Sequence, residues 1–135
     1  MEYTEFIDRL QMRTSRILYQ HNVGSGFDVL DVGFYEYEGY ILAEIEMINV
    51  VYKKRGTGTA LVLHLVTYLI EQACTKDKAL KVFVEPEYGS QEFWEKVKER
   101  LIIKGFTSYW GASEISRDLS GMYLILDPKS IEIAY

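Results

Sequence analysis

Cysteine, basic charge and long apolar runs are all scarce in this sequence of 135 residues. The single cysteine, Cys74, excludes an intrachain disulfide and fits a reducing compartment. No apolar run approaches the ~18 residues of a membrane span, and the acidic first residues lack the apolar segment of a signal peptide. The 20 Asp and Glu outnumber the 15 Lys and Arg, so the basic face that a nucleic-acid backbone requires is missing. We therefore expect a cytoplasmic protein without membrane or nucleic-acid partners.

The rest of the composition is that of an ordinary folded protein. The hydrophobic fraction is 48% and the charged fraction 26%, and both are usual for a globular domain. A chain of this length supports one hydrophobic core. We expect residues 1–135 to form a single domain without a metal site, and the thiol of Cys74 to be buried and inert.

The N-terminal segment has a mostly helical spacing of apolar residues. Thr4 is a suitable cap for a helix that runs to about Gln20. Apolar side chains recur along one side of this helix: Phe6, Ile7, Leu10, Ile17 and Leu18. A polar loop over 21–26 follows. Because the helix begins almost at residue 1, we expect no strand, or only a very short one, before the helix.

Alternating patterns then predict a β-hairpin and, further on, a mixture of helices and strands. The first pair of strands covers 27–37 and 40–51, joined by a tight turn at Glu38-Gly39. An apolar helix reaching Ala73, a strand over 79–84, a helix that Ser90 caps, and strands over 106–110 and 122–126 complete the order. The tail from Lys129 is expected to pack or pair at a sheet edge. This order of elements predicts an α/β (α+β) fold.

Between the second strand and the apolar helix lies a short basic segment with two glycines. Gly56 and Gly58 allow a ligand to approach the backbone closely, and the first amides of a helix attract anions. The segment therefore predicts a phosphate site. The Walker A pattern is excluded because Thr59-Ala60 follows Gly58, and the dinucleotide pattern is excluded because Leu61 replaces its third glycine.

The pattern Arg-x-x-Gly-x-Ala at Arg55, Gly58 and Ala60, with Val50 five residues ahead of the Arg, resembles motif A of the GNAT superfamily of N-acetyltransferases. Ser90–Lys96, with Gly105-Phe106 downstream, is similar to the A-x-x-F-Y-x-K…G-F signature of the same family. The resemblance covers roughly 27–127. It implies a mixed central sheet of about 5–6 strands, with a splayed parallel pair and helices on both faces.

The resemblance also implies a cosubstrate and a reaction. Acetyl-CoA would lie between the splayed strands, and an amine-bearing acceptor, a small molecule or a protein, would attack its thioester directly. The pantetheine amides would pair with the backbone of Ile48, Asn49 and Val50. The pyrophosphate would lie on the amides of Arg55, Gly56, Thr57, Gly58, Thr59 and Ala60.

Two glutamates are candidates for the general base. The segment Ala43-Glu44-Ile45 resembles the Ala-Glu-Ile of histone-type family members, in which the glutamate is the base, so Glu44 is the first choice. Glu46 lies on the same strand face, roughly 7 Å along the strand, and is the second. Neighbouring carboxylates can raise one another's pKa. A solvated strand face is the alternative explanation for both.

The acid that protonates the leaving thiolate is less clear from the sequence. Where many family members have a tyrosine, this chain has Trp94, whose indole cannot act as an acid. Tyr88 is the nearest candidate, and Tyr123 is a more distant one. Two other readings stay open: a catalytically impaired GNAT-fold module that binds acyl-CoA or a protein partner, and an unrelated α+β binding domain.

Charge is the only property of the acceptor that the sequence indicates. Polyamines, amino sugars, N-termini and protein lysines all carry an amine of the required kind. Acidic residues along the expected cleft favour a cationic acceptor: Glu44, Glu46, Glu85 and Glu87. The sequence leaves open whether the chain forms a homodimer.

Overall fold

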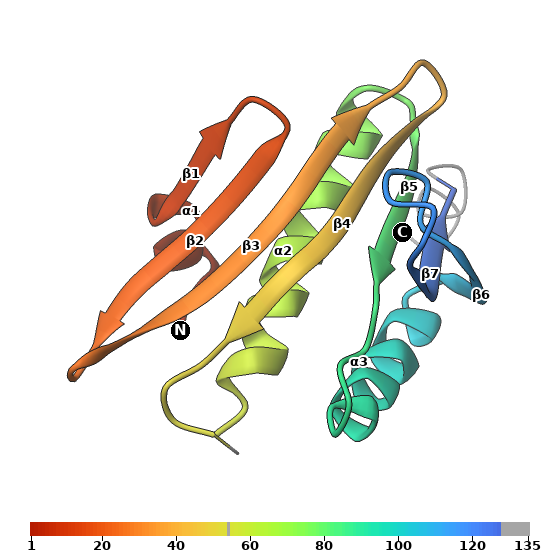
Figure 1. The fold of residues 1–135 in the computed structure, drawn as a ribbon. Coiled ribbons are helices and arrows are strands. Elements are labelled where there is room, and N and C mark those ends of the chain that lie inside the picture. The colour runs from red at the N-terminus through yellow and green to blue at the C-terminus, as the bar shows by residue number, and fades with distance from the viewer. Residues whose placement is uncertain (54, 128–135) are drawn as a thin grey trace.

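The computed structural model describes residues 1–53 and 55–127. In these ranges three helices accompany a seven-stranded sheet of order β1-β2-β3-β4-β5-β7-β6 (Figure 1). The elements are α1 (Tyr3–Asp8), β1 (Leu10–Arg13), β2 (Arg16–Val23), β3 (Gly26–Glu36), β4 (Tyr40–Asn49), α2 (Thr57–Thr75), β5 (Ala79–Val84), α3 (Gln91–Ile103), β6 (Thr107–Ala112) and β7 (Ser120–Leu126). Lys54 of the basic segment and the tail from Lys129, expected at a sheet edge, lie outside the described residues.

The expected mixed fold is confirmed, with seven strands in place of about five to six. Only β4 and β5 are parallel, and the other neighbouring pairs are antiparallel. No described helix is both long and apolar enough to cross a membrane.

The N-terminal prediction is wrong. The helix ends at Asp8, and the segment expected to continue it forms β1 and β2 instead. Ile17 and Tyr19 are buried while the residues between and around them are not, which is the period of two that a strand requires. Thr4 lies inside α1 and does not cap it, since Glu2 occupies the N-cap position. Two strands therefore lie between α1 and β3, where the rest of a helix and a loop were expected.

The parallel pair diverges as expected. Its last aligned residues are Ile45 and Val84, yet β4 continues to Asn49 along β3. Figure 1 shows the two strands parting beyond this point. The register between β3 and β4 also shifts, because Val32 faces Ile45 while Asp31 faces Met47, which leaves Glu46 as an extra residue. Such a bulge bends a strand and redirects side chains.

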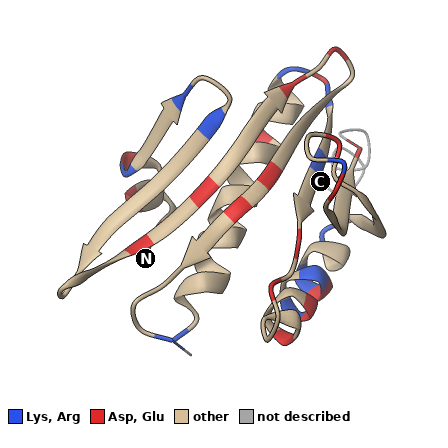
Figure 2. Cartoon of the chain, in the orientation of Figure 1, with Lys and Arg blue, Asp and Glu red and all other residues tan. Residues whose placement is uncertain are grey.

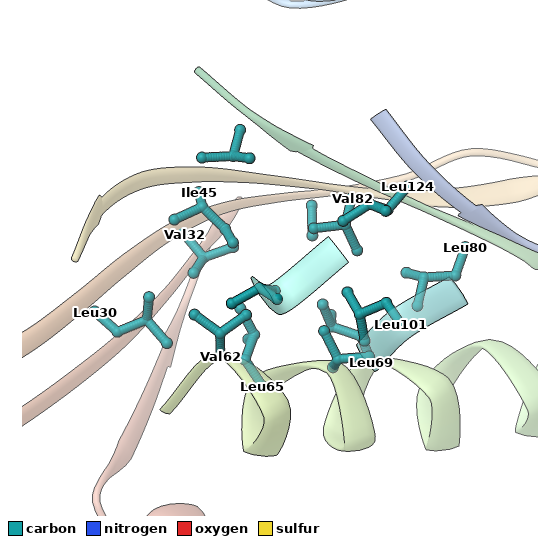
Figure 3. Packing of buried hydrophobic residues seen from close by; sticks show 14 of the residues in the cluster. Leu30, Val32, Ile45, Val62, Leu65, Leu69, Leu80, Val82, Leu101 and Leu124 are labelled. Carbon is teal, nitrogen blue, oxygen red and sulfur yellow. The ribbon is translucent and has the colours of Figure 1, made fainter. Parts of the chain in front are cut away.

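One face of the sheet carries the main core. Buried residues from all three helices form a single cluster with alternate residues of the strands. Figure 3 shows Leu65 and Leu69 of α2 pointing towards Val32, Ile45 and other strand residues. The expectation of helices on both faces is therefore not met within the described residues. The apolar spacing of α2 and α3 could not indicate which face each helix would cover.

The opposite face carries a much smaller cluster of Leu42, Phe83 and Tyr123, with Tyr35 and Tyr40 beside it. It is covered in part by the segment between β6 and β7, residues 113–119, which we call the 113–119 loop. Tyr123 holds this loop by donating a hydrogen bond to Ala112 O (2.7 Å) and accepting one from Glu114 N (3.0 Å). Cys74, expected to be buried, is exposed.

Candidate active site

The glycine-containing turn delivers the start of α2 beside the end of β4. Gly56 is the N-cap residue of α2 and has φ +78°, a left-handed conformation that glycine adopts without strain. Ala60 N already bonds Gly56 O at 3.0 Å. No described side chain caps this helix end. The amides of Thr57, Gly58 and Thr59 therefore offer an anion site, while the amide of Ala60 belongs to the helix.

A buried aspartate holds the beginning of this turn. Asp28 is only 7% exposed, and its Oδ1 accepts a hydrogen bond from Val51 N at 2.8 Å. The tip of the β2–β3 hairpin also lies against the turn, because a Cβ at Gly26 would come within 3.1 Å of Val51. Sequence reasoning missed Asp28, although a lone acid between the apolar positions of a strand was a signal for such a role.

Charge at the turn comes from Arg55. Its guanidinium lies over the ring of Tyr52, 4.7 Å from the centroid, and its side chain is exposed. A pocket of about 270 Å³ adjoins the turn and is lined by Arg55, Tyr52, Thr57 and Asp28, among others. The cation is therefore placed next to the free amides, as an anionic ligand would require.

The start of α2 also meets the start of α3 and the end of β4. A Cβ at Gly58 would lie 3.3 Å from Phe93 and 3.9 Å from Ile48. Gly58 is thus the point of closest approach between the turn and α3. The backbone of Ile48 and Asn49 belongs to β4 beyond its last residue paired with β5, and Val50 follows directly.

Glu44, the first choice for the base, is buried at 5% exposure. Ser113 Oγ of the 113–119 loop donates a hydrogen bond to its Oε1 at 2.5 Å. The same hydroxyl oxygen accepts bonds from the amides of Ile115 (3.2 Å) and Ser116 (3.0 Å). Glu44 therefore anchors a loop whose Ser113 lies 69 residues further along the chain.

Glu46, the second choice, has a different environment. It is exposed and is the first residue of β4 beyond the last pair with β5. Burial by its surroundings raises the pKa of its carboxyl, and the charges of Glu44 and Asp31 raise it further, while Arg16 acts in the opposite sense. Oε1 of Glu46 would lie 3.4 Å from a Cβ atom at Gly33.

The aromatic residues considered for the role of general acid differ widely in exposure. Tyr88 is fully exposed in the turn before α3. Tyr123 is buried, its hydroxyl is engaged with the backbone, and burial raises its pKa to about 12, so it gives up a proton reluctantly. Trp94 is buried in the core with its ring edge-on to Phe93 at 4.9 Å.

The charge distribution separates the two parts of the site. Figure 2 shows acidic positions along the middle of β3 and β4, and basic residues at the turn that follows β4. Asp31 is paired with Arg16 through two hydrogen bonds, one of them 2.7 Å long. An anion is thus favoured at the start of α2, and a cation is favoured beside Glu46.

Comparison with known proteins gives similarity in structure and not in sequence. No protein-family profile matches the chain, and no curated protein matches it in sequence. A diaminobutyrate acetyltransferase from Paenibacillus lautus, solved with its substrate and coenzyme A, has a TM-score of 0.49 and 13% identity over 84% of this chain and 70% of that one. An aminoglycoside 6′-N-acetyltransferase from Enterococcus faecium has a TM-score of 0.47 and 12% identity over 93% and 78%.

A third solved structure is the N-terminal domain of a ribosomal-protein-alanine acetyltransferase from Clostridium acetobutylicum. It has a TM-score of 0.46 and 12% identity over 91% of this chain and 98% of that one. Because these TM-scores lie below 0.5, we infer the function below from the chain's own residues. These proteins are similar to the chain in fold alone, and the sequence of the turn at Arg55, Gly58 and Ala60 resembles motif A of the GNAT superfamily of N-acetyltransferases.

Proposed function

We propose that residues 1–135 act as an acetyl-CoA-dependent N-acetyltransferase that transfers acetyl to a primary amine of a small molecule or protein. One observation carries the proposal. The only parallel pair in the described sheet diverges beyond Ile45 and Val84, and the uncapped start of α2 lies at the end of the strand that continues. Such a divergence leaves backbone groups of β4 free to pair with an extended, amide-containing ligand.

The phosphate end of that ligand suits the turn. The free amides of Thr57, Gly58 and Thr59 and the guanidinium of Arg55 would hold the pyrophosphate. The backbone of Ile48, Asn49 and Val50 would pair with the pantetheine amides. The acetyl group would then reach the divergence near Glu46.

The chemistry needs one base on the acceptor side. We assign this role to Glu46, because it is exposed at the divergence and its raised pKa makes it a better proton acceptor than an ordinary carboxylate. Glu46 takes a proton from the ammonium form of the acceptor. The amine nitrogen then bonds the acetyl carbonyl carbon, the carbon–sulfur bond breaks, and the thiolate leaves with the electron pair. The nitrogen loses its second proton to solvent as the amide forms.

Glu44 has a supporting role in this proposal, since its carboxylate is buried and bonded to Ser113. Tyr88 stays the proposed donor of a proton to the thiolate, because it lies exposed ahead of α3. A thiolate is a tolerable leaving group, so Tyr88→Phe is expected to slow turnover only modestly.

Two measurements test the proposal in sequence. Acetyl-CoA should raise the melting temperature, whereas ATP and NAD at the same concentration should not. Release of free thiol from acetyl-CoA should then depend on an added amine when a panel of polyamines, amino sugars and peptides is screened. Absence of any thermal shift with CoA esters would overturn the proposal.

A second candidate is a module that binds acyl-CoA without turnover. Trp94 favours it, because the family resemblance implies a tyrosine acid at this position and the chain has a buried indole there. This candidate predicts thermal stabilisation by acetyl-CoA together with no amine-dependent thiol release from any acceptor in the panel.

A further inference from the structure

The hydrogen bonds around Ser113 determine which group is the donor in its contact with Glu44. A serine hydroxyl has one proton and can accept at its oxygen. The amides of Ile115 and Ser116 both donate to this oxygen. The single proton of Ser113 therefore goes to Glu44 Oε1, at 2.5 Å, and a hydrogen bond to a charged acceptor is stronger than one between neutral groups.

The loop geometry makes this donor rigid. Ser113 is 1% exposed, and its own amide bonds Leu119 O at 2.8 Å, which closes the 113–119 loop on itself. Glu114 is held in turn by Tyr40, at 3.2 Å, and by Lys81, at 3.5 Å. Turning the side chain of Ser113 away from Glu44 would break the bonds that its oxygen accepts from the amides of Ile115 and Ser116.

The charge held at Glu44 acts on Glu46, two residues along the same strand. Glu46 is faced by Glu44 on β4, by Asp31 and Tyr35 on β3, and by Arg16 on β2. Arg16 is hydrogen-bonded to Asp31. Of the two acidic neighbours of Glu46, Glu44 is therefore the one without a described bond to a cation. Tyr35 and Tyr123, the titratable groups that sense Glu44 from β3 and β7, are both neutral at physiological pH.

We propose that Ser113 is a positioning residue that fixes the carboxylate of Glu44 beside Glu46 and thereby sets the pH range over which Glu46 accepts the proton of the acceptor. This inference rests on the proposed acetyltransferase function and deepens it. Without the hydroxyl, the buried carboxylate of Glu44 loses its donor and is no longer held in this position. Glu46 then feels less repulsion and ionises at lower pH.

The test is the pH dependence of kcat/KM for four variants. Ser113→Ala and Glu44→Gln should each move the acidic limb of the profile to lower pH by about one unit, the size expected when a bond to a charged group is lost. Ser113→Thr keeps the hydroxyl, and Ser116→Ala changes a neighbouring side chain in the same loop. Both should retain the wild-type profile. Combining Ser113→Ala with Glu44→Gln should give no additional shift.

A second readout does not depend on turnover. The carboxyl carbon of Glu46 can be followed by NMR in glutamate-labelled protein and assigned through Glu46→Gln. Its titration should move to lower pH in Ser113→Ala. If that variant does not fold, Ser113→Cys keeps the size with a weaker donor, and a smaller shift in the same direction is expected.

The outcomes separate the two proposals. A titration of Glu46 and an acidic limb that both stay unshifted in Ser113→Ala overturn the role of Ser113, while amine-dependent turnover leaves the enzyme proposal standing. A shifted titration in a protein that acetylates no amine supports the coupling of Ser113 to Glu46 and counts against the proposed function.

Discussion

Single residues decide whether the turn can receive a ligand. Gly58 lies where the start of α2, the ring of Phe93 and the side chain of Ile48 come together. A glycine inside the first turn of a helix is otherwise unfavourable by about 1 kcal/mol relative to alanine. Close backbone approach is the physical reason for a glycine at this place.

Replacing Gly58 with valine should therefore weaken acetyl-CoA binding more than it affects folding. The branched side chain would push against Phe93 and cover the free amides, and we expect a loss of at least about tenfold in affinity, or about 1.4 kcal/mol. Titration calorimetry measures it. Gly39→Val is the control, because nothing lies within 4 Å of a Cβ there, and equal affinity losses in both variants would contradict the prediction.

Replacing Glu46 with glutamine should raise the stability of the protein while it lowers the activity. Its pKa is raised in the fold, so folding favours the neutral acid, and this contribution to stability is lost as the pH rises through that pKa. Glu46→Gln should thus be more stable than the wild type at pH 7, with the difference vanishing near pH 3. Urea unfolding at the two pH values measures this effect.

The same variant should lose about 10²- to 10⁴-fold in kcat/KM if Glu46 is the general base. Asp31→Asn serves as the comparison, since it removes a nearby charge without removing the base. Full turnover by Glu46→Gln would show that another group accepts the proton.

Among the elements, the turn between β4 and α2 depends on a strand that precedes it. Asp28 of β3 reaches Val51 N and so couples the hairpin of β2 and β3 to the turn that is proposed to hold the phosphate. This hairpin therefore supports the turn from one side, and the segment predicted as a helix supplies the first part of its strand β2.

Asp28→Ala should loosen this turn. A buried amide would lose its acceptor, at a cost of about 1–3 kcal/mol in the free energy of unfolding, and affinity for acetyl-CoA should fall with it. Asp28→Asn keeps a carbonyl oxygen for Val51 N and should lose much less of both. Urea unfolding measures the loss of stability, and titration calorimetry measures the affinity for acetyl-CoA. An alanine variant with unchanged affinity would show that the turn does not hold the ligand.

Across the molecule, acidic and basic side chains lie in different regions. The net charge is −5, the acidic positions lie along β3 and β4, and the basic ones follow at the turn (Figure 2). Helices cover the opposite face of the sheet, which leaves the face of Glu46 for an acceptor.

A cationic acceptor should therefore bind more weakly as salt is added. Raising the ionic strength from about 0.01 M to 0.1 M shortens the screening length from about 30 Å to 10 Å. The KM of a polyamine should rise several-fold over this range, while the KM of an uncharged aromatic amine should change little. Equal responses would argue against charge as the basis of acceptor choice.

Local sequence patterns determined the strand, turn and helix around the proposed phosphate site. The apolar spacing of α2 and the glycines before it are properties of neighbouring residues, and they led to the order of elements from β3 to β7. The N-terminal strands were missed because their apolar residues also fit a helical spacing, and the turn between them contains no glycine, although Ser15 has φ +58°.

Tertiary structure alone distinguished the two carboxylates. Glu44 and Glu46 are equivalent in the alternating pattern of β4, yet one is buried and bonded to a loop 69 residues away, and the other is exposed beside a bulge. Burial, charge pairing and hydrogen bonding depend on segments that meet only in the fold. The sequence by itself therefore predicted the glycine-containing turn and the start of the helix, and the packing of distant segments decided which carboxylate is buried and which is exposed.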